Sequence, residues 1–120
     1  DMRSEGKRSI QHAIACNTFN GGHVFGGRIH APSGIDLRTE GMVLMKNGIH
    51  QASATAAEVL GNPIHAVAFI ANKLGELGLG LNAGMVLLTG SIVSSIPIAA
   101  GDTVQIRFST LGDLTMRFAD

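Results

Sequence analysis

The sequence predicts an α+β fold that is rich in β-structure and has one main helix, at about 62–77. Apolar residues recur in that stretch at the spacing of one helix face. Two other stretches, 38–55 and 103–118, combine strand-forming residues with turn signals and so indicate two β-hairpins. The 120 residues are close to the usual size of one domain, and no linker divides them, so 1–120 is expected to be a single domain.

The composition argues against nucleic-acid binding and membrane insertion. Nine basic side chains balance nine acidic ones, so no attraction to nucleic acid or to an anionic membrane is expected. Trp and Tyr, the commonest base-stacking residues, are absent. No apolar run approaches the ~20 residues of a membrane span. One cysteine allows no internal disulfide, and the charged start does not resemble a signal peptide, so a cytoplasmic location is expected.

The first third of the chain is expected to contain short elements between turns. Residues 9–17 have apolar positions at a helical spacing, with Ser9 as a suitable N-cap. A short strand is predicted at 23–25, where a glycine pair follows, and a turn at 31–34.

The first hairpin is predicted from its central Asn-Gly pair. Residues 35–45 are expected to form a strand, because the continuous apolar run at 42–45 suits burial on both faces. Asn47-Gly48 is a strong hairpin signal, and 49–55 would be the returning strand.

The main helix has signals at both ends. Asn62 is a suitable N-cap, and Pro63 fits the first helical position, where the missing N–H costs nothing. Gly78 suits the C-terminal end. One stripe is apolar throughout, and further apolar side chains flank it, so we expect this helix to be covered on most sides. The stripe comprises Ile64, Val67, Ala68, Ala71 and Leu74.

The last third predicts a buried strand followed by a second hairpin. Residues 85–89 form an apolar run typical of a buried strand. Residues 103–109 alternate, so that Val104, Ile106 and Phe108 share one face. A turn at 111–113 leads into a second alternating stretch, 114–118.

Candidate catalytic groups are few. The five histidines are scattered, and no two carboxylates are separated by a single residue, so the spacing indicates no metal site in this chain. His12 precedes Cys16 by four residues and would share its helix face, but a buried structural cysteine is the favoured interpretation. The glycine pairs at 21–22 and 26–27 do not match a phosphate-binding loop.

Thr89-Gly90-Ser91 is the strongest candidate for a binding site. A hydroxyl and a flexible backbone follow directly after the predicted strand 85–89, where donors can be presented to an anion. On the sequence alone, however, a turn that ends a strand is the more common explanation of such a segment.

Several spaced motifs resemble one enzyme family. These are A-A-E-V-L-G-N-P-I-H-A-V-A-F-I-A-N-K-L-G-E-L-G at 56–78, L-N-A-G-M-V-L-L-T-G-S at 81–91, P-I-A-A-G-D-T-V at 97–104 and L-G-D-L-T-M-R-F at 111–118. Together they are similar to the C-terminal half of the 2-hydroxypenta-2,4-dienoate hydratases and 4-oxalocrotonate decarboxylases, in the fumarylacetoacetate hydrolase superfamily. The resemblance covers nearly the whole chain and is most specific from 41 onward.

The resemblance implies a mixed β-roll or sandwich with one main helix, and a chemistry. Family members use Mg²⁺ or Mn²⁺ to add water to, or decarboxylate, small 2-keto or 2-hydroxydienoic acids in the breakdown of aromatic compounds. The family's metal ligands are three carboxylates, two in an E-x-E pair and one just before the segment matching Asp1-x-Arg3. These positions, and that of the catalytic lysine, are expected to lie outside this chain. Thr89 and Gly90 match residues that contact the substrate carboxylate, with Ser91 beside them.

One segment departs from the family pattern. Where hydratases have a D-x-V-A-D-N-A-S-like stretch lining the active site, this chain has His12, Cys16 and Phe19 at three polar positions, and only Asn17 keeps its identity. We therefore expect a truncated or divergent hydratase-like protein that is not active by itself, with Asn17, Thr89, Gly90 and Ser91 facing a small keto-acid or dienoate. The alternatives are a non-catalytic homo-oligomeric module on the same scaffold, or a piece of a longer enzyme.

Overall fold

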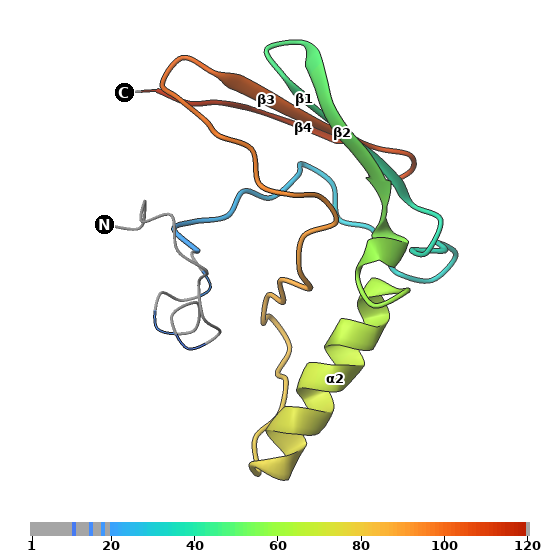
Figure 1. The fold of residues 1–120 in the computed structure, drawn as a ribbon. Coiled ribbons are helices and arrows are strands. Elements are labelled where there is room, and N and C mark those ends of the chain that lie inside the picture. Colours follow the sequence, from blue (N-terminus) through green and yellow to red (C-terminus); the bar gives the residue numbers. More distant parts are fainter. Residues whose placement is uncertain (1–10, 12–14, 16–17, 19, 120) are drawn as a thin grey trace.

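The computed structural model describes residues 11, 15, 18 and 20–119 of the chain. Four strands form one antiparallel sheet in the order β2-β1-β3-β4. They are β1 (Gly41–Lys46), β2 (Ile49–Thr55), β3 (Thr103–Phe108) and β4 (Asp113–Arg117). A short 3-10 helix (Ala56–Glu58) and the α-helix α2 (Pro63–Glu76) follow β2. Figure 1 shows α2 projecting away from the sheet, and the later chain returning alongside it. The predicted α+β class is confirmed.

Both predicted hairpins are confirmed. In the first, Asn47 and Gly48 have φ of 52° and 76°, the left-handed values that a tight type I′ turn needs at both central positions. In the second, β3 and β4 pair through a turn over 109–112. The first strand begins at Gly41 and not at 35 as predicted. Asp36 organises the preceding turns instead, because its carboxylate accepts from the backbone N–H of Arg38 at 3.1 Å.

The core lies on one face of the sheet. Met42, Leu44 and Val104 are the buried residues at its centre. The predicted alternation of β3 is confirmed, because Ile106 and Phe108 join Val104 on this face. The segment 92–96 crosses beneath the sheet and covers it. The core therefore lies between one face of the sheet and an irregular segment.

The predicted ends of α2 are confirmed. The Asn62 side chain accepts from the Ile64 N–H at 3.0 Å, which caps the first turn. At the other end Gly78 has φ of 70°, and the N–H groups of Gly78 and Leu79 donate to the carbonyls of Gly75 and Leu74. This double closure is a Schellman motif, and glycine suits it because it adopts positive φ without strain.

The expectation that α2 is covered on most sides is wrong for this chain. No residue of α2 is buried, and Phe69 is 59% exposed. Figure 1 shows the reason: α2 leaves the edge of the sheet and, among the described segments, lies beside only the returning one. Within the described part of the chain its apolar stripe therefore has one neighbour, and much of its apolar surface is exposed.

Two of the predicted strands are absent from the described part of the chain. Residues 23–25 and 85–89 are irregular. Met85, Val86 and Leu88 are each more than half exposed. An isolated strand leaves its backbone groups unpaired, and no strand described in the structure lies next to either segment. The predicted helix at 9–17 falls mainly outside the described residues.

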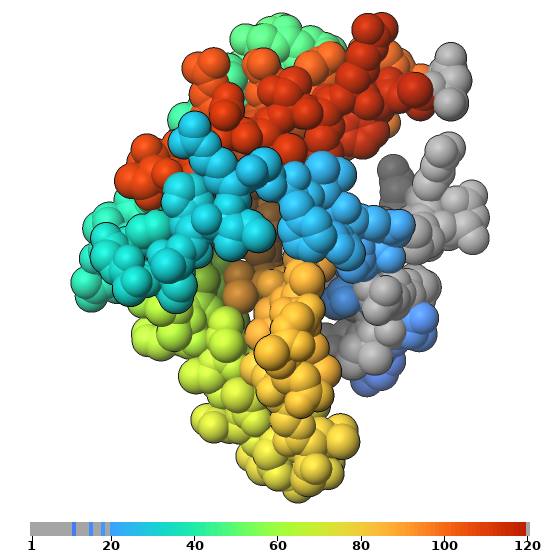
Figure 2. Space-filling model, turned by 180° about the vertical axis from the view of Figure 1, so that it is seen from behind, coloured from blue at the N-terminus to red at the C-terminus, as the bar shows by residue number. Residues whose placement is uncertain are grey.

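The segment 20–40 forms part of the molecular surface. Figure 2 shows the segment 20–40 crossing the face of the molecule that lies behind the view in Figure 1. Residues Arg28, His30 and Leu37 of that segment border a small groove with Leu111.

Within 20–119, the only α-helix, α2, is too short to cross a membrane.

A polar network fastens the first hairpin turn to the start of β3. The Lys46 ammonium lies 2.8 Å from Asp102, and the Asn47 side-chain amide donates to the same carboxylate at 2.7 Å. Asn47 Oδ1 accepts from the Thr103 N–H at 2.8 Å. The Lys46 contact, helped by the Ala99 N–H and by Asn47, lowers the pKa of Asp102 from 3.8 to about 2.

This network predicts a loss of stability in acid. A carboxyl group whose pKa is lower in the folded protein stabilises the fold above its unfolded pKa, and this stabilisation is lost as pH falls through the folded value. For Asp102 the window runs from 3.8 down to about 2. We expect Asp102→Asn to be less stable than the parent protein near neutral pH, and the difference to shrink across that window. Urea denaturation at a series of pH values measures it. A difference that does not change with pH would contradict the assignment.

Candidate functional site

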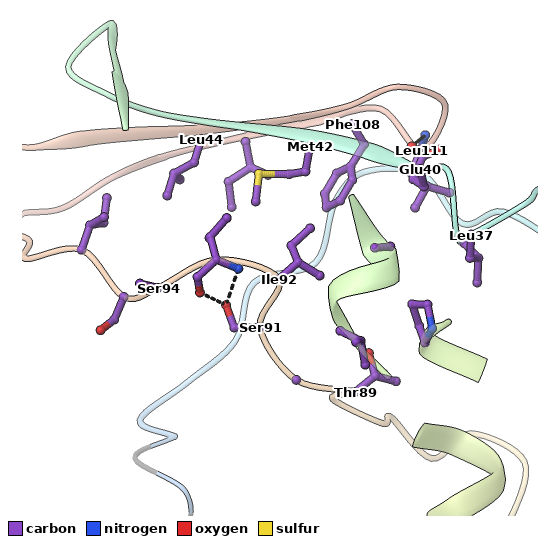
Figure 3. A pocket seen from close by; sticks show the side chains of 18 of the residues that line it. Leu37, Glu40, Met42, Leu44, Thr89, Ser91, Ile92, Ser94, Phe108 and Leu111 are labelled. Atoms are coloured by element: carbon purple, nitrogen blue, oxygen red, sulfur yellow. Dashed lines mark hydrogen bonds between the residues drawn. The ribbon is translucent and has the colours of Figure 1, made fainter. Parts of the chain in front are cut away.

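A cavity of about 570 Å³ lies between the sheet and the segment 89–98. Met42, Leu44 and Phe108 point into it from β1 and β3, and Ile92 points toward them from the opposite wall (Figure 3). The 3-10 helix contributes Ala56. The walls are therefore mostly apolar, which suits a small organic molecule with a hydrocarbon part.

Thr89, Gly90 and Ser91 all line this cavity. The sequence predicted them as one binding segment, and the structure places them together where the segment that returns alongside α2 enters the space beneath the sheet (Figure 3). Gly90 has φ of 115°, a conformation that side-chain-bearing residues rarely adopt. Thr89 also borders a smaller groove against Val67 of α2. The segment therefore lies between α2 and the cavity.

The Ser91 hydroxyl makes both its hydrogen bonds to the backbone of Val93, two residues along the chain. Its Oγ donates to the Val93 carbonyl and accepts from the Val93 N–H at 3.4 Å, so it closes a small turn (Figure 3). By contrast, no hydrogen bond found among the described residues uses the backbone N–H of Thr89, Gly90 or Ser91. Those three groups, together with the Thr89 hydroxyl, are the donors that this segment can offer to an anion.

Glu40 is a buried carboxylate at the edge of the cavity that was not predicted from the sequence. Its exposed fraction is 3%. Oε1 accepts from the N–H groups of Thr110 and Leu111 at 2.8 and 3.1 Å, and Oε2 accepts from Thr110 Oγ1 at 2.6 Å. Burial alone raises the pKa of Glu40, but these three bonds and the nearby His30 outweigh it, so the pKa lies below 4.5.

The role of Glu40 is to hold the cavity rim together. The partners Thr110 and Leu111 lie 70 and 71 residues further along the chain. Its backbone carbonyl also accepts from the Ala56 N–H at 2.9 Å, which fixes the 3-10 helix. The only signal in the sequence is an acidic residue directly before an apolar strand, and nothing there identifies its partners.

The described residues do not form a metal site. Within 20–119 no three His, Cys, Asp or Glu side chains lie close enough to share an ion. Among the described residues, Glu40 is the only carboxylate lining the cavity, and both its oxygens are already bonded to Thr110 and Leu111. A divalent cation needs several oxygen ligands, so this donor set does not fit one. His12, Cys16 and Asn17, which the sequence analysis singled out, lie outside the described residues.

Comparison with known proteins identifies similar chains. Residues 2–119 match the model of the fumarylacetoacetate (FAA) hydrolase C-terminal family. A 2-oxo-hept-4-ene-1,7-dioate hydratase of Escherichia coli is 33% identical over 98% of this chain and 44% of its own length. A 4-oxalocrotonate decarboxylase of Pseudomonas putida is 36% identical over 98% of this chain and 45% of its own length. The chain thus spans less than half the length of these relatives.

Solved structures agree on the fold. The 4-oxalocrotonate decarboxylase from Pseudomonas putida G7, complexed with magnesium and adipate, superposes with a TM-score of 0.73. It is 41% identical, over 78% of this chain and 35% of its own chain. The same enzyme complexed with calcium and acetate gives the same TM-score over 36% of its chain.

Proposed function

Because this chain belongs to the fumarylacetoacetate hydrolase C-terminal family, we propose that it is a truncated or divergent hydratase-like protein that binds a small keto-acid or dienoate. In this proposal it carries the substrate-facing part of the scaffold. The metal-assisted chemistry, with Mg²⁺ or Mn²⁺, requires carboxylates that the described residues do not supply. We therefore expect the chain alone to be inactive as a hydratase.

The cavity with Thr89-Gly90-Ser91 at its rim is the observation that carries this proposal. A small unsaturated acid has a charged carboxylate and a flat hydrocarbon part. The N–H groups of residues 89–91, which no other described residue uses, would bond the carboxylate, and Met42, Ile92 and Phe108 would pack against the hydrocarbon and exclude water. The relative with a bound dicarboxylic acid, adipate, supports a ligand of this class.

A ligand titration with a glycine variant tests the binding half of the proposal. Adding adipate or 2-oxopent-4-enoate to the ¹⁵N-labelled protein should shift the backbone amide signals of Thr89 and Gly90. Gly90→Val should weaken binding by about tenfold or more, because a β-branched residue at φ of 115° is strained and would move the donors.

Gly34→Val is the matched control for that experiment. Gly34 has φ of 91°, has open space around it, and does not line the cavity. It should share the backbone strain and keep the affinity. The binding proposal is wrong if saturating acid leaves the Thr89 and Gly90 signals unmoved, or if both variants weaken binding equally.

A second candidate is a non-catalytic homo-oligomeric module. Its specific support is the exposed apolar surface of α2 and of the segment beside it, including Phe69, Leu77 and Leu88, which are 59%, 74% and 63% exposed. Exposed apolar side chains of this kind favour association where they form a patch. Sedimentation equilibrium distinguishes the candidates: a monomer at all concentrations would argue against this one, and an oligomer that binds no acid would favour it.

A further inference from the structure

The chain contains two Asn-Gly steps in contrasting surroundings. They are Asn20-Gly21, in an exposed loop, and Asn47-Gly48, in the β1–β2 turn. Asn-Gly is the dipeptide in which a backbone nitrogen most easily attacks the preceding side-chain amide, because glycine places no side chain in the way. Neither step takes part in the proposed acid-binding cavity.

We propose that Asn20 is a site of spontaneous deamidation, and that the Lys46–Asn47–Asp102–Thr103 network protects Asn47 from the same reaction. In the reaction the Gly21 nitrogen attacks Asn20 Cγ. A C–N bond forms, the side-chain nitrogen leaves as ammonia, and a cyclic succinimide results. Water then opens either ring carbonyl to give aspartate or isoaspartate. Water is the only co-reactant, and no oxidant or reductant is needed.

The loop around Asn20 favours this attack. Asn20, Gly21 and Gly22 are exposed, and a Cβ built on either glycine would meet nothing within 4 Å. The Gly22 N–H donates to Asn20 Oδ1 at 3.1 Å. Attack on Cγ places negative charge on that oxygen, so this donor stabilises the transition state as an oxyanion-hole donor does.

The surroundings of Asn47 oppose the attack. Its Nδ2 donates to Asp102 at 2.7 Å, and its Oδ1 accepts from the Thr103 N–H at 2.8 Å. Both polar atoms of the amide are thus bonded toward the start of β3, and Cγ cannot turn onto the Gly48 nitrogen unless both bonds break. Deamidation here would also put a carboxylate against Asp102, so protection of this step preserves the hairpin turn.

Peptide mapping by mass spectrometry after incubation of the folded protein at mildly alkaline pH tests the proposal. Replacement of the side-chain NH₂ by OH should accumulate at Asn20 at least about tenfold faster than at Asn47, since two hydrogen bonds must open at the second site. In concentrated urea the two rates should become similar. Equal rates in the folded protein, or a faster reaction at Asn47, would overturn the proposal.

Two variants test whether the hydrogen bonds of the network protect Asn47, or whether the overall stability of the fold does. Asp102→Ala removes the acceptor of Asn47 Nδ2 and should speed deamidation at Asn47 but not at Asn20. Lys46→Met removes the ion pair but leaves that acceptor, and should have a smaller effect at Asn47. If Asp102→Ala does not fold, as circular dichroism would show, the comparison of folded and urea-treated parent protein decides. A folded Asp102→Ala protein with unchanged Asn47 chemistry would contradict the protective role of the network.

Discussion

Leu44→Ala is expected to lower the free energy of unfolding by about 2–5 kcal/mol, the usual cost of removing a buried leucine side chain. Leu44 is 5% exposed and lies on β1, with β2 and β3 on either side. It belongs to the core and also lines the cavity, so its removal enlarges a space that is already open. Urea denaturation monitored by circular dichroism measures the change.

Val43→Ala is the matched control for Leu44→Ala. Val43 is the preceding residue of the same strand, points to the opposite face and is 36% exposed. Its truncation should cost about 1 kcal/mol or less, because Val43 is partly exposed and the substitution removes little buried apolar area. Similar losses for the two variants would show that the core does not lie on the face assigned to it.

Glu40→Ala is expected to destabilise the fold by about 3 kcal/mol. The substitution leaves the Thr110 and Leu111 N–H groups without their acceptor in a part-buried place, where each such group costs near the lower end of about 1–3 kcal/mol. The same change should loosen the cavity rim. We therefore also expect weaker acid binding in the titration described above.

Glu40→Gln is the control that separates geometry from charge. A glutamine can still accept from both N–H groups through Oε1 and donate to Thr110 Oγ1, so its cost should be near 1 kcal/mol. The pKa of Glu40 is lowered on folding, so the advantage of glutamate exists above its ordinary value of 4.5 and fades as pH falls below it. Equal losses for both variants would contradict this account of the three hydrogen bonds.

The parts of the fold that the sequence predicted correctly are those with local signals. Asn47-Gly48 specifies a turn through its own backbone preferences, and Asn62-Pro63 specifies a helix start. The ends of α2 and both hairpins were therefore predictable. The prediction of a strand at 85–89 was wrong, because its apolar run resembles a buried strand, yet a strand also needs a neighbour and the described sheet offers it none.

Only the part of the candidate site that is contiguous in the sequence could be proposed from local signals. Thr89-Gly90-Ser91 is a contiguous segment, so its residues necessarily stay together, and the structure places them at the cavity. The bonding of Glu40 to Thr110 joins residues 70 apart, and no local pattern encodes such a pair. That the Ser91 hydroxyl closes a turn with Val93 also depends on the path of the chain beneath the sheet.

Turnover of 2-hydroxypenta-2,4-dienoate in the presence of Mg²⁺ tests the central claim most directly. The claim is that this chain carries the substrate-facing cavity, and that its described residues do not supply the carboxylates of a metal site. It predicts that the isolated chain consumes the dienol, followed by its absorbance, no faster than buffer does, and that calorimetry detects no binding of Mg²⁺. Mg²⁺-dependent loss of dienol absorbance, catalysed by this chain alone, would contradict it.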